Sequence, residues 1–375
     1  MVSRRSILSS SACALAAPFL NRGRFRLFAH SHAEYSTRTL DLVRGSTVVD
    51  MLGLLTLDYR KLAAAQTQTA AFPAHEFDLL KRSGVTVIHP AVGFTAGDVR
   101  NSSRSDLTRW NHFLAAHPDR FLRVDAPADL ERAKASGKIG VILGLQNSAH
   151  FDTLADVDLF YAIGQRVSQL TYYDNPLGGG SGNPTRGLSP FGAEVATRMN
   201  HLGMAIDVSH CADRTTLDAI EISRKPVLIT HSNCRALVPN SGRCKTDEAI
   251  RKLAAKGGVF GVTLVRSFVR ASGPATIEHA LKHIDHVISV AGVEHAGLGT
   301  DVDQQGRDRP GARKFDLDGA DYSRKIYDIT EGLVGRNYTA ADIEAILGGN
   351  FRRALSEIWT GPPHRAEPHR NPSTR

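Results

Sequence analysis

The sequence predicts an α/β protein built as a (β/α)8 barrel of the TIM type, with one catalytic domain. Eight short apolar runs rich in β-branched residues alternate with helix-like segments, which is the order expected of strand-helix units around a barrel. The composition, 42% hydrophobic and 22% charged, is that of a globular chain. The length of 375 residues fits one barrel with extended termini.

Each apolar run is long enough for one strand, and its lack of alternation indicates burial on both faces, as in a parallel sheet. The runs are Thr47–Met51, Val85–Val92, Ile139–Gln146, Val167–Tyr172, Gly203–His210, Pro226–His231, Gly258–Val265 and His295–Asp301. An open doubly wound sheet is the alternative. The barrel is favoured because no G-x-G-x-x-G follows an early strand, and the glycines at 178–180 lack the G-K-[S/T] of a phosphate loop.

Helical signals lie between the runs. Thr215–Arg224 has apolar residues at helical spacing, and Ile277–Val290 has a helical apolar period. Thr246–Lys256 starts with a threonine followed by two acids, which is typical of a helix N-terminus.

The N-terminus predicts an export signal over residues 1–33. Ser3-Arg4-Arg5-Ser6-Ile7-Leu8 has the form of a twin-arginine motif, and a moderately apolar stretch follows it. A basic, unstructured N-terminus is the alternative. Export places the mature protein in the periplasm or outside the cell. The barrel is expected over residues 45–360, and the proline-rich, charged residues 361–375 are expected to form a disordered tail.

Net charge argues against a nucleic-acid partner. The chain carries +8, but residues 1–33 contribute five arginines and no acid, and the tail adds more positive charge. The body is therefore nearly neutral and lacks the broad basic surface of a nucleic-acid binder. Beyond the N-terminal segment no apolar run approaches the length of a membrane span, so no integral span is expected after signal removal.

The cysteines do not form a disulfide framework. Cys13 falls in the expected signal, which leaves three, an odd number. Pairing of Cys234 with Cys244 stays open at this point. The chain has no C-x-x-C, so a thiolate zinc site is not expected.

Polar residues at strand ends predict the site, because chemistry in a barrel collects at the carboxyl ends of the strands. His210 and His231 end consecutive runs, Gln146 ends the third, and Asp301 ends the last. Two imidazoles and an oxygen ligand are a common zinc arrangement. Hydrogen-bonded structural histidines are the alternative. Asp207, within an apolar run, needs a partner if buried and is expected to support a ligand.

Several sequence blocks carry a family resemblance. They are G-L-S-P-F-G (187–192), M-N-H-L-G-M (199–204), D-V-S-H (207–210), T-H-S-N-C-R-A-L (230–237), R-C-K-T-D-E (243–248), G-L-G-T-D-V-D (297–303) and G-G-N-F-R-R-A-L (348–355). In this order they resemble the membrane (renal) dipeptidase family of zinc peptidases, which are amidohydrolase-like barrels. The resemblance covers residues 45–358.

The resemblance implies a two-zinc site at the barrel mouth. His210 and His231 match the histidine ligands of one metal, and Asp301 matches the aspartate that also handles the proton of the attacking water. Arg243 matches the arginine that binds the terminal carboxylate of the substrate, although the loop before it is one residue longer here. Family members often form dimers, so a homodimer is one expectation.

At three places the sequence departs from the family motifs, and at these places the family's ligand and substrate-binding residues are not present. The family's D-G-H-x-D reads Asp50-Met51-Leu52-Gly53-Leu54, so leucines replace a histidine and an aspartate ligand. Gln146 stands at the bridging glutamate, and Asp174 stands at or near the substrate-facing histidine. Leucine cannot ligate a metal, and a neutral amide cannot bridge two dications as a carboxylate does.

Two hypotheses follow. The first is a hydrolase of dipeptides or related small N-acyl amino acids, with about one Zn²⁺ per chain. His210 and His231 bind this metal, and Gln146, Asp174 or Asp301 supplies an oxygen ligand. In it Asp301 is the general base, and Arg243, Asp174 and Tyr172 contact the substrate. The second is a catalytically inactive barrel that binds a small ligand. Serine catalysis is not expected, because no Ser-His-Asp arrangement is apparent.

Overall fold

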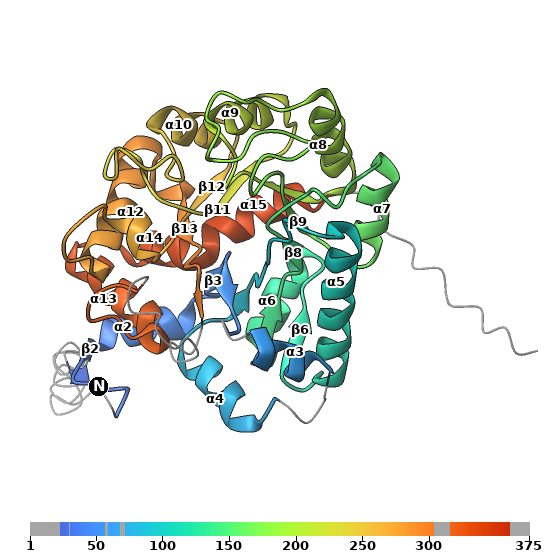
Figure 1. The fold of residues 1–375 in the computed structure, drawn as a ribbon. Coiled ribbons are helices and arrows are strands. Elements are labelled where there is room, and N and C mark those ends of the chain that lie inside the picture. The colour runs from blue at the N-terminus through green and yellow to red at the C-terminus, as the bar shows by residue number, and fades with distance from the viewer. Residues whose placement is uncertain (1–22, 30, 57–58, 68–71, 304–315, 361–375) are drawn as a thin grey trace, which may run out of the picture.

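The computed structural model describes residues 23–29, 31–56, 59–67, 72–303 and 316–360. A closed ring of parallel strands lies at its centre and helices surround the ring (Figure 1). The strands of the ring are β3 (Val49–Asp50), β5 (Val87–Ile88), β7 (Ile139–Val141), β8 (Gly144–Leu145), β9 (Val167–Gln169), β10 (Ala205–Asp207), β11 (Leu228–Ser232), β12 (Val259–Val262) and β13 (Ala296–Leu298).

The ring closes because every strand pairs on both sides. β13 pairs with β3, β3 with β5, β5 with β7, and β8 with β9, all parallel. β7 and β8 are two parts of one strand, interrupted at residues 142–143. Each of the eight predicted runs therefore supplies one barrel strand, and the prediction of the barrel is confirmed.

Three short strands, β4 (Gly53–Leu54), β6 (Phe121–Arg123) and β14 (Val302–Asp303), lie beside the ring. β6 adds to the outer side of β7, and β4 pairs with β14 just beyond the ends of β3 and β13. A hairpin of β1 (Arg24–Phe25) and β2 (Tyr35–Ser36) precedes the barrel. Part of the predicted signal, residues 23–29 and 31–33, is thus described. Residues 1–22 and the predicted tail lie outside the described residues.

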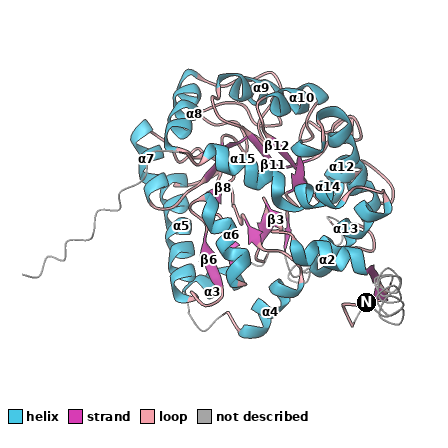
Figure 2. Cartoon of the chain, turned by 180° about the vertical axis from the view of Figure 1, so that it is seen from behind, coloured by secondary structure: helices cyan, strands magenta, loops and turns pink. Residues whose placement is uncertain are grey.

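The helices form the outer layer (Figure 2). They are α2 (Thr37–Gly45), α3 (Tyr59–Thr67), α4 (Ala74–Arg82), α5 (Val99–Ala116), α6 (Pro127–Ser136), α7 (Leu154–Ala162), α8 (Pro190–Leu202), α9 (Asp213–Ile222), α10 (Asp247–Ala255), α11 (Arg266–Val269), α12 (Ile277–Ala291), α13 (Lys325–Gly335), α14 (Ala340–Glu344) and α15 (Asn350–Ile358). The three predicted helices correspond to α9, α10 and α12. Thr246 caps α10, since its hydroxyl accepts a hydrogen bond from the Ala249 N–H.

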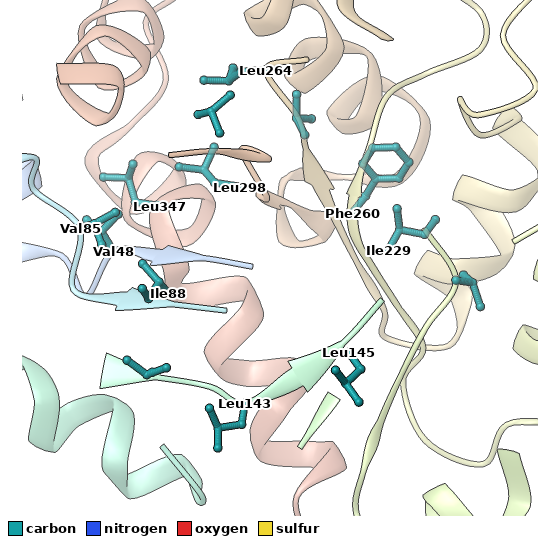
Figure 3. Close-up of a cluster of buried hydrophobic side chains, with 14 of the residues drawn as sticks. Val48, Val85, Ile88, Leu143, Leu145, Ile229, Phe260, Leu264, Leu298 and Leu347 are labelled. Carbon is teal, nitrogen blue, oxygen red and sulfur yellow. The ribbon is translucent and has the colours of Figure 1, made fainter. Parts of the chain in front are cut away.

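The core has two parts. Side chains on the outer face of the strands, such as Leu145, Ile229 and Leu298, pack under the helices (Figure 3). Side chains inside the ring, including Val49 and Val259, pack with Phe351 and Leu355 of α15. α15 thus contacts the interior of the barrel directly, and the ring is a packed core with its polar residues at the strand ends.

Candidate functional site

His210 and His231 meet at the carboxyl ends of β10 and β11. The Nε2 atoms of the two imidazoles lie 3.0 Å apart, and the rings are tilted by 55°. His231 is fully buried and His210 is 9% exposed. His210 lies three residues past β10, and His231 is the penultimate residue of the neighbouring parallel strand β11. These positions at adjacent strand ends bring the two side chains to one point.

Hydrogen bonds behind His231 fix where its proton sits. The Thr230 hydroxyl lies 2.8 Å from both Asp207 Oδ2 and His231 Nδ1. A carboxylate only accepts, so the hydroxyl donates to Asp207, and the Nδ1–H of His231 then donates to the hydroxyl oxygen. The His231 Nε2 atom that faces His210 is left with its lone pair, as a metal ligand requires.

Asp207 organises both strand ends. Its Oδ1 accepts hydrogen bonds from the Ser209 N–H at 3.0 Å, the Ser209 hydroxyl at 2.5 Å and the Thr230 N–H at 3.0 Å. The Ser209 hydroxyl also accepts from the His231 N–H at 3.0 Å. The prediction that buried Asp207 needs partners is confirmed, and those partners join the segments that carry the two histidines.

Both imidazoles are held neutral. Burial lowers the pKa of His210 and of His231 well below the usual value, and the Arg243 guanidinium lowers both further. Desolvation disfavours a charged ring, and a neighbouring cation adds to that effect. Neutral imidazole is the form that binds a metal ion.

Tyr172 contacts the pair through His210. The two rings stack with centroids 4.1 Å apart and planes inclined by 20°. Tyr172 is partly exposed, while its neighbour Tyr173 is 65% exposed. The predicted contact residue thus forms one wall beside His210.

Arg243 is buried beside the histidines, and much of its guanidinium binds the protein itself. Nη1 donates to the Ser209 carbonyl at 2.7 Å and to Ser232 Oγ at 3.1 Å, and Nη2 donates to the His231 carbonyl at 2.8 Å. The Nε–H is buried and has no partner among the described residues. Arg243 therefore ties β10 to β11, a structural role that its predicted carboxylate contact did not include, and two of its five N–H donors, the Nε–H and one Nη2–H, are left over.

Asp174 binds its own loop, and its contact with the substrate stays a prediction. Its carboxylate accepts from the Gly180 N–H at 2.8 Å, from Asn183 Nδ2 at 2.9 Å and from Arg186 Nη1 at 3.0 Å. These bonds lower its pKa, the one from Asn183 most strongly. The loop they fold places the Ser181 N–H 2.7 Å from the His210 carbonyl.

Gln146 lies at the end of β8 with its amide fixed. Nε2 donates to the Ala91 carbonyl at 2.9 Å, and Oε1 has no hydrogen-bond partner among the described residues. Only Oε1 is thus available as a ligand. Leu52 and Leu54 are buried apolar side chains at the neighbouring mouth of β3.

Asp301 has a left-handed backbone, with φ of +57°, and its N–H donates to the Leu52 carbonyl at 2.7 Å. Its charge interacts with Arg243 across the mouth. The described residues contain no cluster of three or more His, Cys, Asp or Glu side chains able to hold a metal. The two-metal centre therefore does not fit these residues.

The histidine pair does fit two positions of one zinc. Nitrogens bound tetrahedrally at about 2.0–2.1 Å from one zinc lie about 3.3 Å apart, close to the observed 3.0 Å. The pair supplies both nitrogens in the neutral form, with one proton position set by Thr230. Within the described ranges, no carboxylate joins the pair as a third ligand.

Two buried residues were missed from the sequence. Thr230 links Asp207 to His231, and Lys245 donates from Nζ to the Cys211 carbonyl at 2.7 Å and to Thr216 Oγ1 at 3.0 Å. The position of Thr230 next to His231 in the sequence could have indicated a role for Thr230 in the site. For Lys245, the only such indication was its place in the R-C-K block (243–245). Cys211, Cys234 and Cys244 are buried and free, so the open question of a Cys234–Cys244 pairing resolves to no disulfide here.

The chain is similar in sequence to known dipeptidases. The family model for membrane dipeptidase (peptidase family M19) matches residues 39–362. The uncharacterized dipeptidase C965.12 of Schizosaccharomyces pombe is 36% identical over 233 residues, 60% of this chain and 53% of that protein. The chain thus spans about half the length of this curated relative.

Solved structures share the fold. An amidohydrolase from Pseudomonas aeruginosa matches with a TM-score of 0.74 at 24% identity, covering 86% of this chain and 99% of the other. A Rhodobacter sphaeroides metallo peptidase, liganded with a phosphinate mimic of the dipeptide L-Ala-D-Ala, matches with a TM-score of 0.70 at 19% identity, covering 83% and 99%. In the described part of the chain, no helix is long and apolar enough to cross a membrane. The chain belongs to the membrane dipeptidase family, peptidase family M19.

Proposed function

We propose that this protein hydrolyses the amide bond of a dipeptide or a related small N-acyl amino acid, with one zinc held by His210 and His231. The observation that carries the proposal is the 3.0 Å approach of two neutral imidazoles whose Nε2 atoms face each other. When bound, zinc would supply a water whose pKa is lowered to about 7.

The protein's own residues then have separate tasks. Asp301, three residues beyond β13, would accept the proton of the attacking water, as a general base does. Arg243 would bind the substrate carboxylate through guanidinium hydrogens that no protein acceptor takes, and the ring of Phe268, whose centroid is 5.1 Å from Arg243 Cζ, covers one face of the guanidinium. Gln146 Oε1 is the proposed third ligand of the metal.

The test is hydrolysis of a dipeptide panel by the zinc-loaded protein, with Asp301→Asn as the variant. We expect Asp301→Asn to lose at least a hundredfold in kcat, within the range that a general base contributes. Asp119→Asn, on an aspartate whose side chain is 71% exposed, is the matched control and should keep full activity. Undiminished turnover in Asp301→Asn would exclude the proposed role.

A catalytically inactive barrel that binds a small ligand is the second candidate function. It is favoured by Leu52, Leu54 and Gln146, which replace three ligands that the family resemblance implies. In that case a zinc-replete preparation carries no metal, and the protein binds small carboxylates through Arg243 without turning over any amide.

We also propose that the chain is exported through the twin-arginine motif at Arg4 and Arg5. The motif lies outside the described residues, and the proposal rests on the sequence alone.

A further inference from the structure

The arrangement of strands decides which part of the mouth the amino end of a substrate reaches. Arg243 follows β11 and contacts the end of β10. In the closed ring, β11 stands opposite β5, and β5 is flanked by β3 and by the β7–β8 strand. A substrate with its carboxylate at Arg243 and its amide at the histidines therefore points its other end toward β3, β5 and β8.

The residues on that side carry no free negative charge among those described. Leu52 and Leu54 are apolar, and Gln146 is a neutral amide with its Nε2 bound to the Ala91 carbonyl. His89 of the β5 segment is fully buried, and burial lowers its pKa. Its Nδ1 lies 2.8 Å from the Met51 carbonyl, within the barrel.

The carboxylates near these strand ends already have partners. Asp174 accepts from the Gly180 N–H and from Asn183, and its charge pairs with the Arg186 guanidinium. Asp50 accepts from Thr300 and lies 3.7 Å from the buried ammonium of Lys325.

Acids on the loops beyond β5 and β8 are engaged as well. Asp98 accepts from the backbone and side chain of Asn101 at the start of α5. Asp156 caps α7 and pairs with Arg100. Asp152 lies 3.9 Å from Arg100 and is largely exposed.

Positive charge is abundant on the carboxylate side. Arg243 and Lys245 are both buried and both lower the pKa of the two histidines. A free α-ammonium group on the side of β3, β5 and β8 would be desolvated with no free carboxylate to pair with among the described residues, and the cations on the carboxylate side would add repulsion. An unpaired buried charge is costly, whereas a neutral acyl group bears no such penalty.

We infer that the preferred substrate is an amino acid with an uncharged N-acyl group, ahead of a dipeptide with a free amino terminus. The inference deepens the proposed hydrolase function and rests on it. It predicts that, of two substrates with the same shape, the protein prefers the one that lacks the positive charge at its amino end.

The experiment compares N-propionyl-alanine with glycyl-alanine, in both the D and the L series, using the full zinc-loaded chain. The two compounds differ by CH₃ against NH₃⁺ at one position. We expect kcat/KM for the propionyl compound to exceed that of the dipeptide at least tenfold. Calorimetric titration of both compounds into Asp301→Asn gives the same comparison without turnover and should show at least a tenfold difference in Kd.

A restored carboxylate provides the matched variant. Gln146→Glu should shift the ratio toward glycyl-alanine, while Gln165→Glu, on a glutamine bound to buried His150, should leave it unchanged in protein that remains folded. Metal content is measured in each variant, so a change in zinc number is recognised. Equal or better use of glycyl-alanine by the wild type would overturn the inference and leave the hydrolase intact. Hydrolysis of neither compound, with the same preference in binding, would overturn the hydrolase and leave the charge preference standing.

Discussion

Removing the Thr230 hydroxyl tests the link between Asp207 and His231. Thr230→Val keeps the side-chain shape, but Asp207 Oδ2 loses its donor at 2.8 Å and His231 Nδ1 loses its acceptor at 2.8 Å. A buried unsatisfied polar group costs about 1–3 kcal/mol, and more when it is charged. We expect the free energy of unfolding to fall by roughly 3–5 kcal/mol.

The same substitution should weaken metal binding. Mutation of the outer partner of a metal-binding histidine typically costs about 10–100-fold in affinity, because tautomer and ring orientation are no longer fixed. The assay is a competition titration of zinc against a chromogenic chelator, run together with urea unfolding of the metal-free protein.

Thr330→Val is the matched control. Thr330 is also fully buried, and its hydroxyl donates to the Ile326 carbonyl one turn back in α13, far from any histidine of the site. It should lose about 1 kcal/mol of stability or less and keep its zinc affinity. Equal zinc affinity in the two variants would refute the role assigned to Thr230.

Three further predictions concern other groups. Arg243→Lys should raise KM for carboxylate substrates at least tenfold and lower the melting temperature, because a lysine cannot reproduce the bonds to Ser209 and His231; an unchanged KM would contradict it. Burial lowers the pKa of both His150 and His283 to about 4, so the folded state excludes protons that the unfolded chain binds. Stability is therefore complete above pH 6.5 and falls by about 3 kcal/mol per group as the pH drops toward 4; urea unfolding across this window should give a shallower slope in a variant lacking both histidines. Arg4→Lys/Arg5→Lys should retain the precursor inside the cell, as fractionation and immunoblotting would detect; continued export would exclude the twin-arginine route.

The barrel could be predicted because its strands are buried on both faces and read as continuous apolar runs. Each such run, for example Gly258–Val265, became a strand with shorter bounds, here Val259–Val262. The break between β7 and β8 was not predictable, since the run across residues 139–146 is apolar throughout. The packing of α15 against the barrel interior depends on tertiary contacts that helical periodicity does not specify.

The part of the site that could be predicted is the part in which the position of a residue along a strand decides where its side chain lies. His210 follows β10 and His231 lies near the end of β11, and the parallel pairing of these neighbouring strands brings the two histidines together. The contacts of Asp174 with Gly180, Asn183 and Arg186 could not be predicted, because they depend on the conformation of the loop that contains these residues. The sequence also could not show that three of the Arg243 bonds go to the protein itself, because those acceptors come from two different strand ends.

The most direct test of a one-zinc site on His210 and His231 is the zinc content per chain of the purified protein, determined by elemental analysis. Wild type, His210→Ala/His231→Ala and the Thr330→Val control are compared after equilibration with zinc. If His210 and His231 hold one zinc, we expect close to one zinc per chain in wild type and control, and none in the double variant. Two zinc ions per chain, or one that persists without both histidines, would contradict it.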